Sequence, residues 1–262
     1  MHGGDRERSL FWDLGGTASL NYNRVEDLGD GVASLPLGPT QFGTSVEAIK
    51  GLPFGELIGY RLRRDPATNA LVLRAGLPQA DSSARVVLGQ SRQNKLVGLR
   101  GTVGYRWLSL SVTGEGRIGG SVFSTTNYNG DVAGSFAETG FRPDSGLLID
   151  GIDAVTGQKN TTHVTTEAYY HALGAVQEPW IYDASFFKLR ELHLSFTVPT
   201  RARSGLPFAS ASLSLITRNV YTWSHNKNFD PEVLLSVYPY PGMELGQLPT
   251  VRTIGVQITV TP

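Results

Sequence analysis

The chain has 262 residues, a length that suits one large domain or two small ones. Its 23 basic residues balance its 23 acidic residues, so the net charge of zero gives no general attraction to nucleic acid or to an anionic membrane surface. The absence of cysteine excludes a disulfide framework, thiolate metal ligands and a cysteine nucleophile.

The first eight residues are charged and contain no apolar stretch, so no signal peptide is expected there. No apolar run in the sequence reaches the length of a transmembrane helix. Glycine is abundant, with 31 residues, and only 18% of the residues are charged, as is ordinary for a β-rich chain with long loops.

The first predicted strand spans residues 10–23. Apolar or small residues alternate with polar ones along it, which is the two-residue period of a β-strand with two different faces. Trp12 and Tyr22 lie near opposite ends of the apolar face. Aromatic residues at both ends of an apolar band are typical of strands that cross a membrane. A long strand of a β-sandwich would show the same pattern.

A long connection follows, from residue 24 to residue 95. Glycine and proline mark several turns in it, and residues 56–62 and 70–73 predict local hairpins. Connections of this length are uncommon in compact domains unless they have a function.

Two strands at residues 96–105 and 108–119 then form a tight hairpin around Arg106. Leucine and valine alternate with serine and threonine on its second arm. Tyr105 and Trp107 flank the turn, so aromatic residues again lie at the edge of an apolar band. A second long loop, residues 120–182, is rich in glycine, threonine, asparagine and aromatic residues.

The strand at residues 187–198 shows the alternation most clearly. Leu192 and Leu194 fall on one face, whereas Glu191 and His193 fall on the other. One-sided alternation is typical of an antiparallel sheet that has an apolar medium on one side and a polar medium on the other.

Two more strands of this kind are predicted, at residues 208–223 and 251–261. A third loop at residues 224–249, rich in aromatic residues and proline, separates them. Long loops and short connections therefore alternate along about six strands, which is the layout of a transmembrane β-barrel with long extracellular loops. Six strands are fewer than the eight of the smallest membrane barrels, so either the chain is part of a larger barrel or it is not a membrane protein.

Four stretches of the chain resemble the C-terminal barrel region of SusC/RagA-like TonB-linked outer-membrane transporters. The first is GELIGY at 55–60 with RDPAT at 64–68, and the second is GYRWLSLS at 104–111 with GEGRIGG at 114–120. The third is DASFFKLREL at 183–192, and the fourth is TRNVYTW at 217–223 with FDPE at 229–232. Their order and spacing match over nearly the whole chain, although the glycine usual after Arg106 is missing.

This resemblance implies an all-β fold, namely the final part of a 22-stranded antiparallel barrel embedded in outer-membrane lipid. It also implies import of an oligosaccharide or a peptide together with a SusD-like surface lipoprotein. The family's N-terminal plug, its TonB-contacting motif and its signal peptide have no counterpart in residues 1–262, so contact with TonB is expected only through a missing N-terminal region. The chain ends on Val260, Thr261 and Pro262, whereas the family usually ends on an aromatic residue.

Aromatic residues of the long loops are the candidate ligand-binding residues. Planar rings stack on sugars and fill apolar peptide pockets, so these residues are expected to line a binding mouth or to pack the loops on each other. They are Tyr128, Tyr169, Tyr170, Trp180, Tyr238 and Tyr240.

No catalytic residue, metal site or cofactor is expected. None of the five histidines has a metal-ligand spacing, and no Gly-x-Ser-x-Gly elbow follows a strand. Asp144, Asp150 and Asp153 lie in a glycine-rich loop, but their spacing departs from that of an EF-hand and favours a solvated loop.

Two hypotheses follow from the sequence. The first is a non-enzymatic transport component of the outer membrane, and the alternative is a soluble β-sandwich that binds carbohydrate in an extracellular protein. The first predicts one exposed apolar band, formed by Leu192, Leu194, Phe196, Ile254, Val256 and Ile258, with Glu191, His193, Thr253 and Gln257 on the other face. It also places the turn at Arg106, the connection 199–207 and the C-terminus on one side, with the three long loops on the other.

Overall fold

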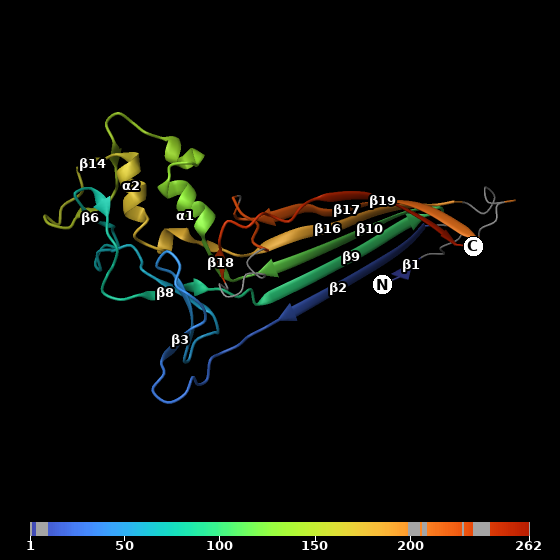
Figure 1. Cartoon of the computed structure of the whole chain (residues 1–262), viewed down its shortest axis with the longest axis horizontal. Coiled ribbons are helices and arrows are strands. Elements are labelled where there is room, and N and C mark those ends of the chain that lie inside the picture. Colours follow the sequence, from blue (N-terminus) through green and yellow to red (C-terminus); the bar gives the residue numbers. More distant parts are fainter. Residues whose placement is uncertain are drawn as a thin grey trace.

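The computed structural model describes residues 10–198, 205, 209–226, 228–232 and 242–261, together with the backbone of residues 2–3. One long sheet forms one end of the molecule, and small sheets and helices form the other end (Figure 1). No helix among the described residues has the length and hydropathy needed to cross a bilayer.

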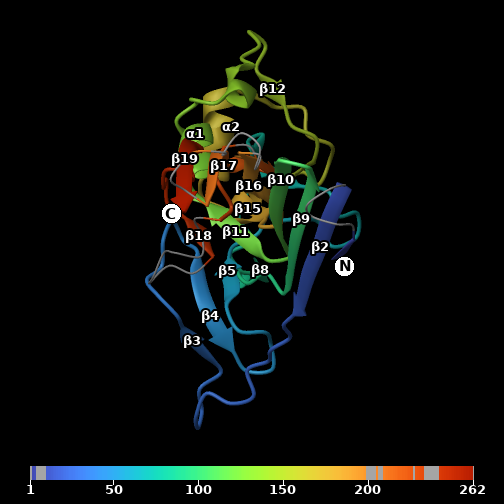
Figure 2. The same ribbon diagram turned by 90° about the vertical axis from the view of Figure 1, so that its right-hand side faces the viewer.

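The long sheet is antiparallel and has the strand order β1-β2-β9-β10-β16-β17-β19. Seen from its end, its strands follow an arc from β19 to β2 (Figure 2). The bounds are His2–Gly3 for β1, Leu10–Leu20 for β2, Lys95–Tyr105 for β9, Leu108–Ile118 for β10, Phe186–Thr197 for β16, Ser210–Ser224 for β17 and Thr253–Thr261 for β19.

The strand register places the apolar residues on one face of the sheet. Leu194 lies opposite Leu110 on one side and Leu215 on the other, and Leu215 lies opposite Val256. This face is exposed along its whole width, since 41% of the surface of Leu194 and 69% of the surface of Val256 are accessible to solvent. The predicted band is therefore confirmed for all its residues except Leu192, which is half-buried.

Polar residues share the opposite face, as predicted. Glu191 lies opposite Arg218, which lies opposite Thr253, and Gln257 lies in the row of Ser214. Hydrogen bonds connect neighbouring strands on this face, from Arg218 to Glu191 at 2.9 Å and from Ser214 Oγ to Ser195 Oγ at 3.0 Å (side chain to side chain).

The hairpin between β9 and β10 turns over two residues, Arg106 and Trp107. Arg106 has a φ of 55°, because a two-residue turn that fits the strand twist requires a left-handed backbone. Its guanidinium lies over the Tyr105 ring, and Trp107 contacts Phe196 with 5.0 Å between ring centroids. This turn lies at the same end of the molecule as the C-terminus (Figure 1), as predicted, whereas all of the connection 199–207 except residue 205 lies outside the described residues.

The other end of the long strands carries the three long connections, which form a folded loop region (Figure 1). Its strands make four small sheets, with orders β3-β4-β5-β8, β13-β6-β7, β12-β14 and β15-β11-β18. Their bounds are Ser34–Pro36 (β3), Ser45–Ile49 (β4), Glu56–Gly59 (β5), Val72–Arg74 (β6), Leu77–Pro78 (β7), Val86–Gln90 (β8), Ser121–Ser124 (β11), Leu147–Leu148 (β12), Ile152–Asp153 (β13), His163–Val164 (β14), Ile181–Asp183 (β15) and Met243–Glu244 (β18).

Among the described residues, the loop region also contains two short α-helices, so the fold is mostly β, and the antiparallel sheet of the prediction is present. The helices are α1 (Thr125–Val132) and α2 (Thr166–Leu173), with the 3₁₀ turns η1 (Ala137–Gly140) and η2 (Glu178–Trp180). Ser124 and Thr165 cap the two α-helices by accepting hydrogen bonds from the backbone N–H groups of Asn127 and Ala168.

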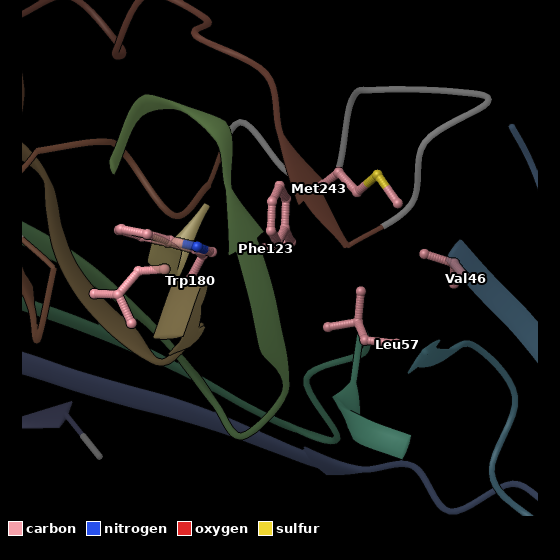
Figure 3. Packing of buried hydrophobic residues seen from close by; sticks show 6 residues of the cluster. Val46, Leu57, Phe123, Trp180 and Met243 are labelled. Carbon is pink, nitrogen blue, oxygen red and sulfur yellow. The ribbon is translucent and has the colours of Figure 1, made fainter. Parts of the chain in front are cut away.

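The hydrophobic core lies in this loop region and not under the long sheet (Figure 3). Val46, Leu57, Phe123, Trp180 and Met243 belong to one buried cluster and come from all three long connections. A sandwich would instead bury the apolar face of the long sheet under a second sheet. The small sheets lie beyond the strand ends and leave that face exposed (Figure 1), which contradicts the sandwich alternative.

Candidate functional site

A network of buried and partly buried charges lies on the polar face, where the long strands enter the loop region. Lys188 of β16 is 1% exposed, and its ammonium donates hydrogen bonds to Asp230 Oδ2 at 2.7 Å, Glu232 Oε2 at 2.6 Å and Thr250 Oγ1 at 2.8 Å. Thr250 in turn donates through its hydroxyl to Asp230 Oδ2 at 2.6 Å. The three N–H donors of the ammonium are therefore all satisfied.

Two arginines extend this network across the sheet. Arg190 contacts Glu232 at 2.6 Å and Glu115 of β10 at 3.0 Å, and Arg117 contacts Glu115 at 2.7 Å. The network thus connects strands β10 and β16 to the last long loop. It also gives a structural role to two of the stretches singled out in the sequence, because FFKLRE and FDPE meet in it.

The acidic loop residues of the network remain ionised. Burial alone would raise the pKa of Asp230, but hydrogen bonds from Lys188 and Thr250 outweigh it and hold that pKa below its ordinary value of 3.8. Burial would also raise the pKa of Glu232, but hydrogen bonds from Arg190 and Lys188 outweigh it and lower that pKa below its ordinary value of 4.5. The loop is thus attached to the strands by charge-assisted hydrogen bonds.

A polar cavity of about 480 Å³ lies next to this network. Its lining is rich in side-chain amides and includes Asn21, Asn23, Phe54, Gln90, Arg92, Gln93, Asn94, Leu96 and Arg117. Amide groups both donate and accept hydrogen bonds, so this lining suits a peptide backbone or sugar hydroxyls. We refer to it as the junction cavity.

Local contacts hold the walls of the junction cavity in place. Asn23 accepts a hydrogen bond from the backbone N–H of Phe54 at 2.7 Å, and the Arg92 guanidinium lies 5.0 Å from the centre of the Phe54 ring. Gln93 donates to the carbonyl of Ala184 at 3.0 Å. Sequence reasoning missed this cavity. The one available signal was the concentration of asparagine and glutamine where the first two strands meet the long connection.

The predicted ligand-binding aromatics are packed in the loop region. Trp180 is 2% exposed in the core, and Tyr128 packs against it with 5.6 Å between ring centroids. Tyr169 and Tyr170 of α2 contact each other at 5.3 Å and also pack against the core. Tyr238 and Tyr240 lie outside the described residues. A ligand-binding role for these six residues stays a prediction.

The acidic loop residues form turns and surface pairs. Asp153 accepts hydrogen bonds from the backbone N–H groups of Val155 and Thr156, and Asp150 lies 3.6 Å from Lys159. In the part of the chain that the structure describes, no group of three or more histidine, aspartate or glutamate residues is arranged to hold a metal ion.

Solved structures of a peptide importer share this fold. The "closed-closed" state of the RagAB peptide importer matches with a TM-score of 0.66 and 14% identity, over 99% of this chain and 28% of that chain. The chain has the fold of part of RagAB. A structure of the RagAB peptide transporter matches with a TM-score of 0.65 and 13% identity, over 99% of this chain and 28% of the other. The "open-open" importer matches with a TM-score of 0.60 and 16% identity, over 95% of this chain and 27% of the other.

The likeness to RagAB supports the resemblance found in the sequence at the level of fold. The chain spans about 28% of the length of the RagAB chain that it matches, and its sequence identity to that chain is low. No protein-family model and no curated protein matches the sequence.

Proposed function

We propose that this chain is the C-terminal part of the β-barrel of a SusC/RagA-like, TonB-linked importer of the outer membrane. The observation that carries this proposal is the exposed apolar face, which runs without interruption from β2 to β19. In water such a face is unfavourable, whereas in lipid it is stabilising. The fold shared with part of RagAB supports the same proposal.

The two ends of the apolar face carry aromatic residues, as two membrane interfaces would require. Tyr105 and Trp107 are exposed at the turn end, and Tyr221 and Trp223 are exposed at the loop end. The two rings at the loop end contact each other with 4.6 Å between centroids. In this proposal the membrane lies across the long strands, and the long loops lie outside the cell, as is usual for bacterial membrane barrels.

In this proposal the chain has no catalytic role and acts on a substrate that is a peptide or an oligosaccharide. The loop region contacts a SusD-like surface lipoprotein, and the junction cavity contacts the substrate as it enters the polar side of the sheet. Contact with TonB belongs to a plug region outside the 262 residues. RagAB is a peptide importer, and its shared fold favours a peptide as the substrate of this chain.

The experiment that tests the proposal is cysteine labelling on intact cells. The longest open reading frame that contains this chain is expressed with Asn129→Cys, in α1, or with Ala209→Cys, next to the start of β17. Because both residues are exposed, a membrane-impermeant maleimide reports on which side of the membrane each one lies. Labelling at residue 129 alone is expected. Labelling of both, or of residue 209 alone, would contradict the proposal.

A further inference from the structure

A second cavity, of about 300 Å³, lies between α1, η1 and α2 in the loop region. Its polar lining includes Asp131, Thr139, Arg142, Thr166 and Tyr170. None of these residues belongs to the charge network or to the junction cavity. We refer to it as the helix cavity.

Asp131, in the last turn of α1, is the unusual residue of the helix cavity. It is 7% exposed, and its Oδ1 is buried with no hydrogen-bond partner among the described residues. Burial, and then the negative charge of Glu138, raise the pKa of Asp131 to about 6, so the carboxylate is mostly ionised at neutral pH. A buried carboxylate with one oxygen left without a hydrogen-bond partner, next to a helix C-terminus, is unfavourable, and a cation would stabilise it.

The hydroxyl protons of the two threonines of the helix cavity are already engaged in hydrogen bonds. Thr139 donates its hydroxyl proton to the carbonyl of Phe136 at 2.7 Å, and Thr166 donates its own to the carbonyl of Phe141 at 2.7 Å. Each hydroxyl oxygen therefore has only lone pairs left for a ligand. With Asp131, the lining offers three acceptors, the number that a primary ammonium group with three N–H donors requires.

The charges around the helix cavity also favour a cation. The negative charge of Glu138 acts on Asp131, and the lining includes Tyr170, an aromatic residue of the kind to which ammonium groups are attracted. The titratable groups that face Asp131 from the surrounding segments are Glu138, Arg142, Glu167, Tyr170, His171 and Tyr182.

We propose that the helix cavity binds the primary ammonium group of a ligand, with Asp131 as its counter-ion and Thr139 and Thr166 as further acceptors. Its size accommodates about one or two amino-acid residues. Peptides carry this group at the amino terminus and on lysine, whereas a neutral oligosaccharide has none. The inference rests on the proposed import function only in that an importer of peptides would bring such a ligand to the loop region.

Binding to the purified full chain in detergent micelles, measured by calorimetry, tests this inference. The probes are tetra-alanine amide with a free amino terminus, its N-acetylated form, and an N-acetylated form with lysine at the third position. Acetylation is expected to weaken binding about tenfold or more, as the loss of one charged hydrogen bond predicts. If the cavity recognises the amine of a lysine side chain, the lysine peptide recovers the affinity. If the cavity recognises the amino terminus, the lysine peptide binds as weakly as the acetylated tetra-alanine amide. Affinity for the free amine falls as the pH drops below about 6, where Asp131 becomes protonated.

Two variants separate a binding role from a structural one. Asp131→Asn keeps the shape of the side chain, removes the buried charge, and is expected to melt at a higher temperature while losing the preference for the free amine. Glu167→Gln is the matched control, since this carboxylate is 78% exposed at the rim of the cavity, and it should change affinity less than about threefold.

The inference is overturned if the free and acetylated peptides bind equally, if neither binds, or if Asp131→Asn keeps the wild-type preference. These outcomes leave the labelling pattern at residues 129 and 209 unchanged. Conversely, a chain that labels at residue 209 but still binds the free amine would contradict the membrane proposal. The assignment of the helix cavity as an amine site would then stand.

Discussion

Lys188 is the residue on which the attachment of the last long loop depends. Replacing it with methionine keeps much of its volume but leaves the carboxylate of Asp230 buried without its partner. Removing one member of a buried ion pair costs about 3–5 kcal/mol, so Lys188→Met should lower the stability of the chain by about that amount. Urea unfolding in detergent micelles, followed by tryptophan fluorescence, measures the change.

Arg218 provides the matched control, because it pairs with Glu191 at 2.9 Å on the same polar face but is 63% exposed. Exposed pairs contribute about 0–1 kcal/mol, so Arg218→Met should have a small effect. Equal losses in the two variants would show that burial does not set the strength of the Lys188 network.

The same network predicts how stability depends on pH. The pKa values of Asp230 and Glu232 are lowered in the folded chain, so the unfolded chain takes up protons first as the pH falls. Their contribution to stability is complete above their ordinary pKa values of 3.8 and 4.5 and is lost as the pH falls through the lower folded values. Urea midpoints between pH 6 and pH 3 should therefore decrease, and Asp230→Asn should flatten that decrease. An unchanged slope in this variant would contradict the assignment.

At the scale of elements, the hairpin between β9 and β10 contains a strained residue. Arg106 has a φ of 55°, a region that costs a residue with a side chain about 1 kcal/mol or more relative to glycine. Arg106→Gly should therefore stabilise the hairpin by up to about 1 kcal/mol, measured by urea unfolding in micelles. Arg106→Ala keeps the strain and loses the contact with the Tyr105 ring, so it should be neutral or destabilising. A glycine variant no more stable than the alanine variant would contradict this explanation.

The six long strands could be predicted from sequence to within about three residues at each end, and for one physical reason. Apolar and polar residues alternate along β16 and β19 and fall on opposite faces of the sheet, so the two-residue period in the sequence predicts these strands directly. The sequences of helices α1 and α2 show no comparable pattern. Thr125–Val132 begins with two threonines and an asparagine and has a glycine at its sixth position. It is helical because Ser124 caps it and Glu244 contacts its first turn.

The candidate sites were harder to predict, because distant segments build them. The helix cavity joins residues from α1, η1 and α2, and the junction cavity joins the end of β2 to Phe54 and Arg117. No local pattern marks such groupings. The aromatic residues were visible in the sequence, but composition does not reveal that Trp180 is buried in the core.

At the scale of the whole molecule, the long sheet has open edges. Among the described residues, β19 pairs with β17 alone, and β2 has only the two-residue β1 beyond it. Open edges and an exposed apolar face both favour association, so the 262-residue chain expressed alone should form inclusion bodies or require detergent. Size-exclusion chromatography with light scattering measures this. A monodisperse monomer without detergent, with a cooperative melt, would contradict the membrane proposal.

The hydrophobic core of the loop region also determines the order in which segments of the chain can pack during folding. Val46 and Met243 belong to the same buried cluster, although they lie near opposite ends of the chain, and β18 completes the small sheet with β11 and β15. The core around the first long connection is therefore incomplete until the last long connection, which carries Met243, has been added. Contacts this distant in sequence form slowly. Until then the earlier loop segments are open to proteases, so the arrival of β18 determines when the loop region becomes resistant to them.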